Sequence, residues 1–230
     1  MSIVLYILKV LHVKLGAQKI SPYLVRFVNS SNPELREFAK SEIAAVTKER
    51  YKNNFNSMTP EMRKLAAQAI QKIDNSFVDD VINDLSSFDP QARLKAALLL
   101  ENIQAGDKAK DALIAAMKDP SKRVRAAIVK TLGVIGSKDL VKQLIEFFND
   151  TDPRVRANTV ESIASLGDSQ VVQILLPYLE DSNNRIRANA VVGIRKFGNF
   201  NVTTVLQCFM GNRRNRRSSI SSINLWIYDK

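Results

Sequence analysis

Apolar side chains recur along this chain at the spacing of one helix face, and the same pattern returns about every 30 residues. An arginine marks the period at Arg36, Arg63, Arg93, Arg125, Arg156, Arg187 and Arg216. The positions seven residues later hold Ile43, Ile70, Leu100, Leu132, Ile163, Ile194 and Ile223. The positions ten residues later hold Val46, Ile73, Ile103, Ile135, Leu166, Phe197 and Trp226. The pattern predicts one amphipathic helix at the start of each unit.

The ends of these helices are also marked in the sequence. Four residues before each arginine stand side chains that can accept a hydrogen bond from a helix's free N–H groups: Asn32, Thr59, Asp89, Ser121, Asp152, Asn183 and Asn212. Proline, which is tolerated at the first helical position, follows four of them as Pro33, Pro60, Pro90 and Pro153. Gly136, Gly167 and Gly198 are predicted to end their helices in the left-handed conformation.

A second apolar segment follows each of these helices. The predicted second helices cover 81–85, 112–117, 140–148, 171–179 and 202–210. Residues 24–33 align without gaps on 144–153, and Gly16 falls on Gly136, so 1–28 is interpreted as a degenerate first repeat. The segment 47–58 fits least well and predicts only a short second helix. No segment alternates with period two, so no sheet is expected.

Two motifs carry a resemblance to a known family: Asp-Pro-Ser-Lys-Arg-Val-Arg at 119–125 and Asp-Pro-Arg-Val-Arg at 152–156. With the registered columns, they make the chain similar to HEAT-repeat proteins, most closely the short bacterial kind first named from phycobilisome lyases. The resemblance implies an all-α fold, a right-handed α-solenoid of about seven helix pairs with an incomplete C-terminal repeat. It implies a single domain over 1–230, with repeats at about 1–31, 32–58, 59–88, 89–120, 121–151, 152–182, 183–211 and a partial 212–230.

The repeating arginine is interpreted as structural, because a group needed for chemistry would occur once rather than in every repeat. In resembling proteins this arginine and the capping acid form a ladder between repeats. The residues assigned to this role are Arg93, Arg125, Arg156, Arg187, Asp89 and Asp152.

The column two residues before the arginine changes sign along the chain. It reads Glu34, Glu61, Gln91, Arg123, Arg154, Arg185 and Arg214. An arginine in the first turn of a helix costs roughly 0.3 to 1 kcal/mol, so its recurrence suggests a stripe that faces an anionic partner. Solvated surface arginines are the alternative. Because resembling arrays bind partners on a concave face, the candidate partner-binding residues are Arg123, Lys130, Arg154, Asn158, Arg185, Asn189 and Arg214.

Charge and composition narrow the function. The chain carries 34 Lys and Arg against 23 Asp and Glu, a net charge of +11, and the excess lies in residues 1–30 and 181–230. Such a balance suits an acidic protein, nucleic acid or an anionic membrane surface. With a single histidine, His12, and a single cysteine, Cys208, most zinc sites lack their ligands. No catalytic residue, metal or cofactor is expected, and the lone cysteine indicates a reducing compartment such as the cytoplasm.

The leading prediction is therefore a non-catalytic interaction scaffold with an acidic protein partner. Nucleic-acid binding through phosphate contacts of the basic C-terminal half is one alternative, although Trp226 is the sole tryptophan and HEAT-like DNA glycosylases use several. A lyase-like or chaperone-like accessory subunit is the other. HEAT-repeat deoxyhypusine hydroxylases need several histidines and are excluded.

The two ends add further expectations. The apolar run 3–13 is shorter than the roughly 20 residues that span a bilayer, so no membrane insertion is expected. Ile220, Ile223 and Trp226 would lack a covering helix, which suggests end-to-end self-association or a chain cut from a longer repeat protein.

Overall fold

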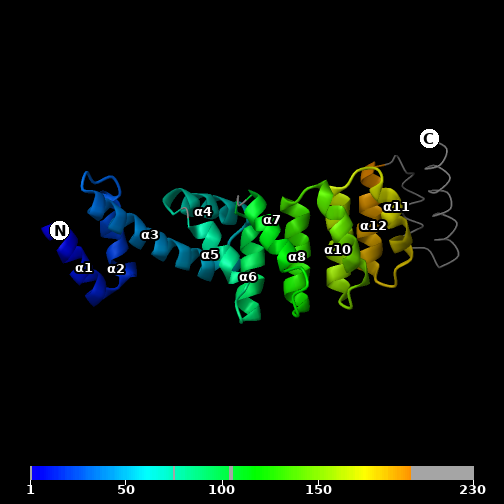
Figure 1. The fold of residues 1–230 in the computed structure, drawn as a ribbon, viewed down its shortest axis with the longest axis horizontal. Coiled ribbons are helices and arrows are strands. Elements are labelled where there is room, and N and C mark those ends of the chain that lie inside the picture. The colour runs from blue at the N-terminus through cyan, green and yellow to red at the C-terminus, as the bar shows by residue number, and fades with distance from the viewer. Residues whose placement is uncertain (1, 75, 104–105, 198–230) are drawn as a thin grey trace. The chain divides into compact units, whose positions relative to one another are not determined.

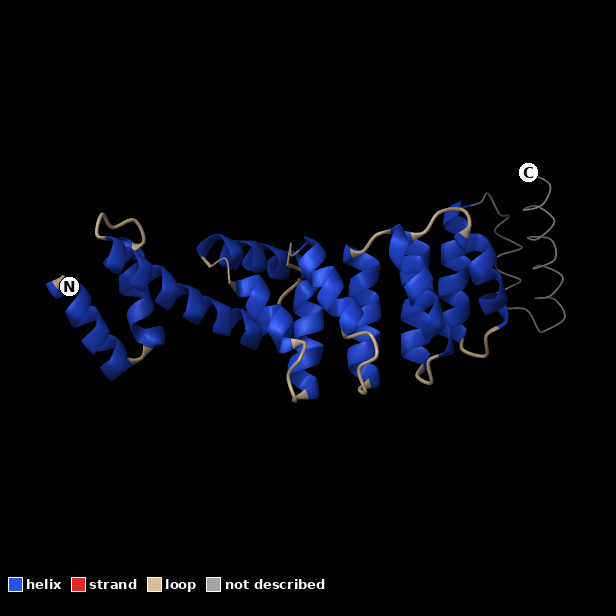
Figure 2. Cartoon of the chain, viewed as in Figure 1, coloured by secondary structure: helices blue, strands red, loops and turns tan. Residues whose placement is uncertain are grey.

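The computed structural model describes residues 2–74, 76–103 and 106–197, and these ranges contain helices joined by loops and no strand (Figure 2). The predicted all-α solenoid class is thereby confirmed. Predictions that concern Gly198, Cys208, Arg214, Arg216 and the residues after them lie outside the described ranges. The chain divides into two compact units, Met1–Asn83 with Asn102–Ala105 and Asp84–Glu101 with Gly106–Lys230. Each unit is described by itself.

The first unit begins with two antiparallel helices, α1 (Ile3–Leu15) and α2 (Ala17–Leu24), followed by a 3-10 turn, η1 (Val25–Phe27) (Figure 1). Gly16 joins them with φ of 81°, a conformation that favours glycine. Leu5, Ile20 and Leu24 are buried where this helix pair packs on the next helix. The predicted helical start of the chain is confirmed.

The next helix corrects the prediction for 47–58. Instead of a separate second helix, α3 runs unbroken over Pro33–Asn54 and ends in the turn η2 (Phe55–Ser57). The position that holds glycine in later repeats is Thr47 here, so nothing stops the helix, and good helix formers follow it. The extension buries Tyr51 and Phe55, whose rings meet edge to face at 5.7 Å between centroids. The unit continues with α4 (Pro60–Ile73) and α5, which begins at Phe77 and ends at Asp84.

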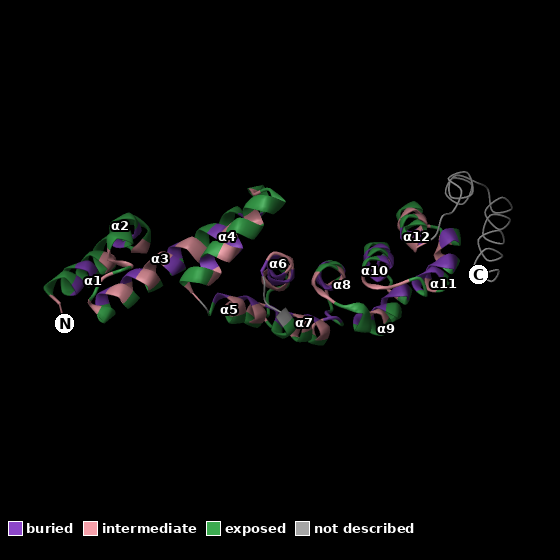
Figure 3. Cartoon of the chain, turned by 90° about the horizontal axis from the view of Figure 1, so that it is seen from above, coloured by how far each residue is buried: buried purple, intermediate pink, exposed green. Residues whose placement is uncertain are grey.

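The second unit holds helix pairs in two layers (Figure 3). The first helices of the repeats make one layer: α6 (Pro90–Leu100), α8 (Lys122–Ile135), α10 (Pro153–Leu166) and α12 (Asn184–Phe197). The other layer holds α7 (Gly106–Ala115), η3 (Lys138–Leu140), α9 (Val141–Leu144), η4 (Ile145–Asn149), α11 (Val171–Leu175) and η5 (Leu176–Glu180). The apolar column supplies the core between them: Leu132 and Ile163 are fully buried and Ile194 is 1% exposed.

Five of the six predicted N-cap residues in the described ranges form a capping hydrogen bond. The side chains of Asn32, Thr59, Asp89, Asp152 and Asn183 each accept a hydrogen bond from the first turn of their own helix. Ser121 is the exception, because its side chain makes no capping bond to α8. In its loop the Asp119 carboxylate accepts from the Ser121 backbone N–H at 2.7 Å.

The prediction of left-handed helix ends at Gly136 and Gly167 is wrong. Both are extended, with φ of −81° and −82°. Glycine is required there for space: a Cβ at Gly136 would lie 2.5 Å from the Leu140 side chain, and one at Gly167 would collide with Val171. The next helix therefore packs directly on the end of the preceding one.

Candidate interaction surface

The repeating arginine closes the loop in front of its own helix. In five repeats its Nη1 donates to the backbone carbonyl six residues earlier. The donor and acceptor pairs are Arg36 to Ser30 and Arg93 to Ser87 at 2.8 Å, and Arg125 to Asp119, Arg156 to Asp150 and Arg187 to Asp181 at 2.9 Å. Arg63 differs, since its Nε donates to the Phe55 carbonyl at 2.8 Å.

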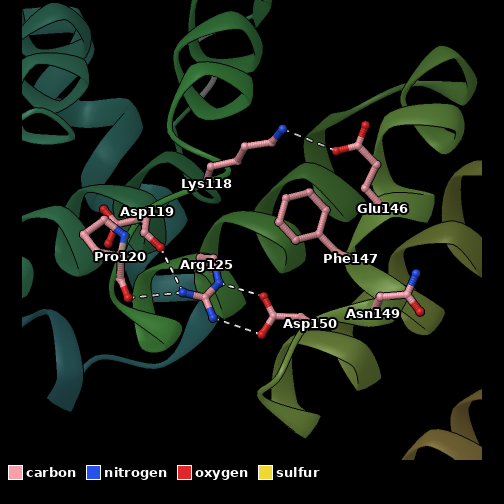
Figure 4. A pocket seen from close by; sticks show the side chains of 8 residues that line it. All are labelled: Lys118, Asp119, Pro120, Arg125, Glu146, Phe147, Asn149 and Asp150. Carbon is pink, nitrogen blue, oxygen red and sulfur yellow. Dashed lines mark hydrogen bonds and ion pairs between the residues drawn. The ribbon is translucent and has the colours of Figure 1, made fainter.

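Two of these arginines also reach the loop of the following repeat. Arg93 donates to both carboxylate oxygens of Asp119 at 2.6 and 3.1 Å. Arg125 does the same to Asp150 at 2.7 and 2.9 Å, as Figure 4 shows. The Arg125 hydrogen bond holds the pKa of the Asp150 carboxyl below its usual value. Burial pushes the pKa of Asp119 upward, but the bonds from Arg93 and from the Ser121 N–H outweigh it and leave that pKa lowered. These bidentate pairs tie each loop to its neighbour.

The acid of this ladder is not the capping residue that the sequence analysis names. Asp89 and Asp152 accept from the N–H groups of their own helices. The arginines pair instead with Asp119 and Asp150, which lie two residues before the cap positions 121 and 152. A sequence signal for them exists, because six residues before the arginine every described repeat carries a short polar residue. These are Ser30, Ser57, Ser87, Asp119, Asp150 and Asp181.

A pocket of about 360 Å³ lies at one rung of the ladder (Figure 4). Its lining residues are Lys118, Asp119, Pro120, Arg125, Glu146, Phe147, Asn149 and Asp150. The charged groups around it pair with one another: Arg125 with Asp150, and Lys118 with Glu146 at 3.6 Å between Nζ and Oε2. We therefore interpret this pocket as a structural joint between repeats.

The candidate partner-binding residues lie in register on the first helices, at the positions −2, +2, +5 and +9 relative to the repeating arginine. We call this set the first-helix face. Its members are Arg123, Ala127, Lys130 and Val134 on α8; Arg154, Asn158, Glu161 and Ser165 on α10; and Arg185, Asn189, Val192 and Lys196 on α12.

The three described arginines of the sign-changing column are not equivalent. Arg123 is exposed and has no hydrogen-bond or ionic partner in the described parts of the chain. Arg154 folds back on its own N-cap, with Nε and Nη2 at 3.0 and 2.9 Å from the two oxygens of Asp152. Its hydrogen bonds hold the pKa of that carboxyl well below the usual range. Arg185 is 57% exposed and donates to Asn158 Oδ1 at 3.0 Å. The column therefore offers two available cations, Arg123 and Arg185, rather than a continuous stripe.

The two asparagines hold neighbouring first helices together. Asn158 is buried, and its Nδ2 donates to the Ala126 carbonyl of α8 at 2.8 Å. Asn189 makes the same bond to Ala157 of α10 at 2.9 Å. Each amide adds a hydrogen bond between two neighbouring first helices, so the two asparagines fix the helices under the first-helix face.

Buried hydroxyls extend this arrangement. Thr131 donates to the Ala97 carbonyl and Ser162 to the Val129 carbonyl, both at 2.9 Å. At the remaining candidate position of α8, Lys130 Nζ lies 3.6 Å from a Glu101 carboxylate oxygen. Thr131 and Ser162 were not among the predicted site residues, although both lie six residues after the repeating arginine of their repeats.

A groove of about 510 Å³ opens between α10 and α12 on the first-helix face. It is lined by Glu161, Ala164, Ser165, Arg185, Asn189, Val192, Gly193 and Lys196. Val192 is 69% exposed and adds apolar surface to the lining, beside Arg185 and Lys196. Lys196 Nζ reaches back to the Ala164 carbonyl at 3.2 Å. The groove thus combines apolar contact area with two cations and the single carboxylate of Glu161.

The described residues contain neither a membrane-spanning helix nor a metal-binding cluster. None of their helices is long and apolar enough to cross a bilayer. Nor do these residues place three or more His, Cys, Asp or Glu side chains together in a group that could hold a metal ion.

These features define an α-solenoid built from repeated helix pairs. The family model described as HEAT repeats matches residues 78–151 and 141–224, which is more than half of the chain. The chain belongs to the HEAT-repeat family.

Comparison with solved structures gave distant similarities. An engineered protein is 19% identical, with 82% of this chain and 81% of that chain covered and a TM-score of 0.44. A chain of a structure of the Pds5–Scc1 complex is 16% identical with a TM-score of 0.46. The match covers 95% of this chain and 34% of that chain, so the present chain spans about a third of the other's length. Comparison with curated proteins gave no match.

Proposed function

We propose that this protein is a non-catalytic scaffold that binds an acidic protein partner on the first-helix face, with the groove between α10 and α12 at the centre of the contact. The observation that carries the proposal is this groove. In its lining, the exposed apolar side chain of Val192 lies beside the exposed cation Arg185. The nearest carboxylate to Arg185 is that of Glu161, 3.9 Å from its Nη2. Interfaces commonly combine an apolar centre with charged groups at the rim.

Rigidity supports the same proposal. The amide bonds of Asn158 and Asn189 hold α8, α10 and α12 at fixed spacing, so the face does not have to order itself when a partner arrives. A preorganised surface loses less conformational entropy on binding. In this account the two asparagines are positioning residues, and the partner contacts are made by Arg123, Arg185, Val192 and Lys196.

The sharpest test reverses the two available cations in one variant, Arg123→Glu with Arg185→Glu. Affinity capture with quantitative mass spectrometry should show a specific partner lost from this variant, and titration of that purified partner should show at least a tenfold loss of affinity. Val192→Ser should weaken the same partner by a smaller factor, because it removes apolar contact area only.

A matched control carries the same change of charge away from the face. Lys118 and Lys142 are exposed outside the first helices, and Lys118→Glu with Lys142→Glu should retain the partner. Equal capture by the charge-reversed variant and the control would refute the proposed surface. All variants should keep the thermal stability of the parent to within a few degrees.

Nucleic-acid binding through phosphate contacts is less well supported, because Arg154 is already engaged by Asp152. A DNA titration at two salt concentrations tests it, since phosphate contacts require a steep loss of affinity with salt. We also propose that the repeats are of the short bacterial kind, with the boundaries given by the sequence, and that the protein acts in the cytoplasm.

A further inference from the structure

The first helix of the chain turns an apolar stripe to solvent. In α1 the side chains of Ile3, Tyr6, Ile7, Val10 and Val13 lie at helical spacing on the side opposite the buried Leu5 and Leu8. Their exposed fractions are 79%, 58%, 49%, 36% and 85%. Surface helices normally place polar side chains on that side. In α1, both the buried side and the exposed side are apolar.

The charges around this stripe have one sign. Residues 1–30 contain Lys9, Lys14, Lys19 and Arg26 and no aspartate or glutamate, and all four cations are exposed. The carboxylates that do approach α1 and α2 come from α3 and are held by the helix pair. Glu42 Oε2 lies 2.7 Å from His12 Nδ1, and Glu49 accepts from Gln18 at 3.4 Å. The outward surface of α1 is therefore apolar and basic.

We propose that α1 docks on an anionic membrane surface. The helix would lie parallel to the bilayer, with Ile3, Ile7 and Val10 in the boundary between headgroups and acyl chains and Lys9 and Lys14 against lipid phosphates. Its 13 residues extend about 20 Å, which suits a helix lying in the interface and is too short to cross the bilayer. Tyr6 has the amphipathic ring that is enriched at this depth.

Charge favours a lipid surface over a second copy of the chain. A symmetric dimer through this stripe would bring Lys14 of both copies to the same contact, and no carboxylate of residues 1–30 could compensate. An anionic leaflet supplies the missing negative charge, and each lysine near such a surface strengthens binding by roughly fivefold.

Co-sedimentation of the full chain with vesicles tests the proposal. The chain should bind vesicles of phosphatidylcholine with about one third phosphatidylglycerol, and should remain in the supernatant with pure phosphatidylcholine. Ile7→Ser with Val10→Ser, at two exposed positions, should reduce binding at least tenfold. Lys9→Glu with Lys14→Glu should reduce it by a similar or larger factor. The controls are Met62→Ser with Leu65→Ser, at two exposed apolar positions of α4, and Lys118→Glu with Lys142→Glu; both should bind as the parent does.

Two outcomes of the vesicle co-sedimentation would contradict docking of α1 on a membrane. Absence of binding to anionic vesicles, or equal binding by the α1 variants and their controls, would overturn the proposal. Light scattering tests whether a second copy of this chain covers the stripe instead. A dimer that Ile7→Ser with Val10→Ser converts to a monomer would show that it does. A monomeric parent that binds only the anionic vesicles supports the membrane surface.

Discussion

The repeating arginines of the two units show how one loop residue changes the way that neighbouring repeats are held. In the second unit, Arg93 and Arg125 find aspartates in the loop of the next repeat and form bidentate pairs. In the first unit, Arg36 and Arg63 occupy the same column, but the loop position of the following repeat holds Ser57 or Ser87. Arg63 instead lies over the Phe55 ring, 4.3 Å from its centroid.

The first unit uses a different connection. Lys48, on the extension of α3, lies 2.8 Å from a carboxylate oxygen of both Asp74 and Asp80. One lysine thus joins α3 to the loop before α5 and to α5 itself. The periodic columns thus give two equivalent rungs, Arg93–Asp119 and Arg125–Asp150, whereas the break in the period is bridged by a contact specific to that place.

The largest predicted effect breaks a rung of the second unit. Asp150→Ala leaves the Arg125 guanidinium, 16% exposed, without its carboxylate and removes the bond to the Asp152 N–H. The free energy of unfolding should fall by about 3 kcal/mol in urea denaturation. Asp139→Ala, at an exposed carboxylate of the same unit, should change it by at most about 0.5 kcal/mol.

The loop acids also predict how stability depends on pH. The pKa values of Asp119 and Asp150 are lowered in the folded state, so their contribution is present above the unfolded value of about 3.9. It is lost as pH falls through the lower folded value. Thermal unfolding between pH 5 and 2 should show this decline, and Asp150→Asn should have a shallower decline than the parent. Identical slopes would show that the rung is not ionic.

A smaller loss is expected in the first unit. Lys48→Met keeps much of the side-chain volume and removes both ion pairs, which are about one fifth exposed on the lysine side. It also ends the bonds that lower the pKa of Asp74. The free energy of unfolding should fall by about 1 kcal/mol. If Lys48→Met were as damaging as Asp150→Ala, the two kinds of connection would not differ in the way described.

The smallest effect repairs an irregularity of the second unit. Ser121→Asn introduces the capping amide that Asn183 supplies in α12, at the predicted cap residue that makes no side-chain bond to its helix. Stability should rise by about 0.5 kcal/mol, because an N–H of the first turn gains an acceptor without adding charge beside Asp119. A loss would mean that the Asp119 turn and a side-chain cap exclude each other.

Much of this fold could be predicted from sequence because its signals are local and repeated. Proline after a capping residue, as at Asp152 and Pro153, fixes where a helix starts. The continuous α3 was not predicted, although Thr47 in place of a glycine is a local signal for it, and the contacts of Tyr51 with Phe55 and Phe77 bury the extension. The extended glycines escaped prediction because their role lies in the closeness of another helix, which no local pattern encodes.

The candidate surface was predicted in position more than in chemistry. Register placed Arg123, Arg154 and Arg185 in one column, but the sequence could not show that Arg154 would bind its own cap. Asn158 and Asn189 were predicted to face a partner, and their amides bond to the backbone of the preceding helix instead. Such bonds depend on the spacing between repeats, which follows from packing along the whole helix.

The most direct test compares two variants against the same purified partner. Arg123→Glu with Arg185→Glu changes the first-helix face, whereas Arg156→Ala changes only the loop contact to the Asp150 carbonyl. Titration calorimetry should show at least a tenfold loss of affinity for the first and little change for the second, whose melting temperature alone falls by a few degrees. Loss of affinity in Arg156→Ala with normal binding by the charge-reversed variant would contradict the account.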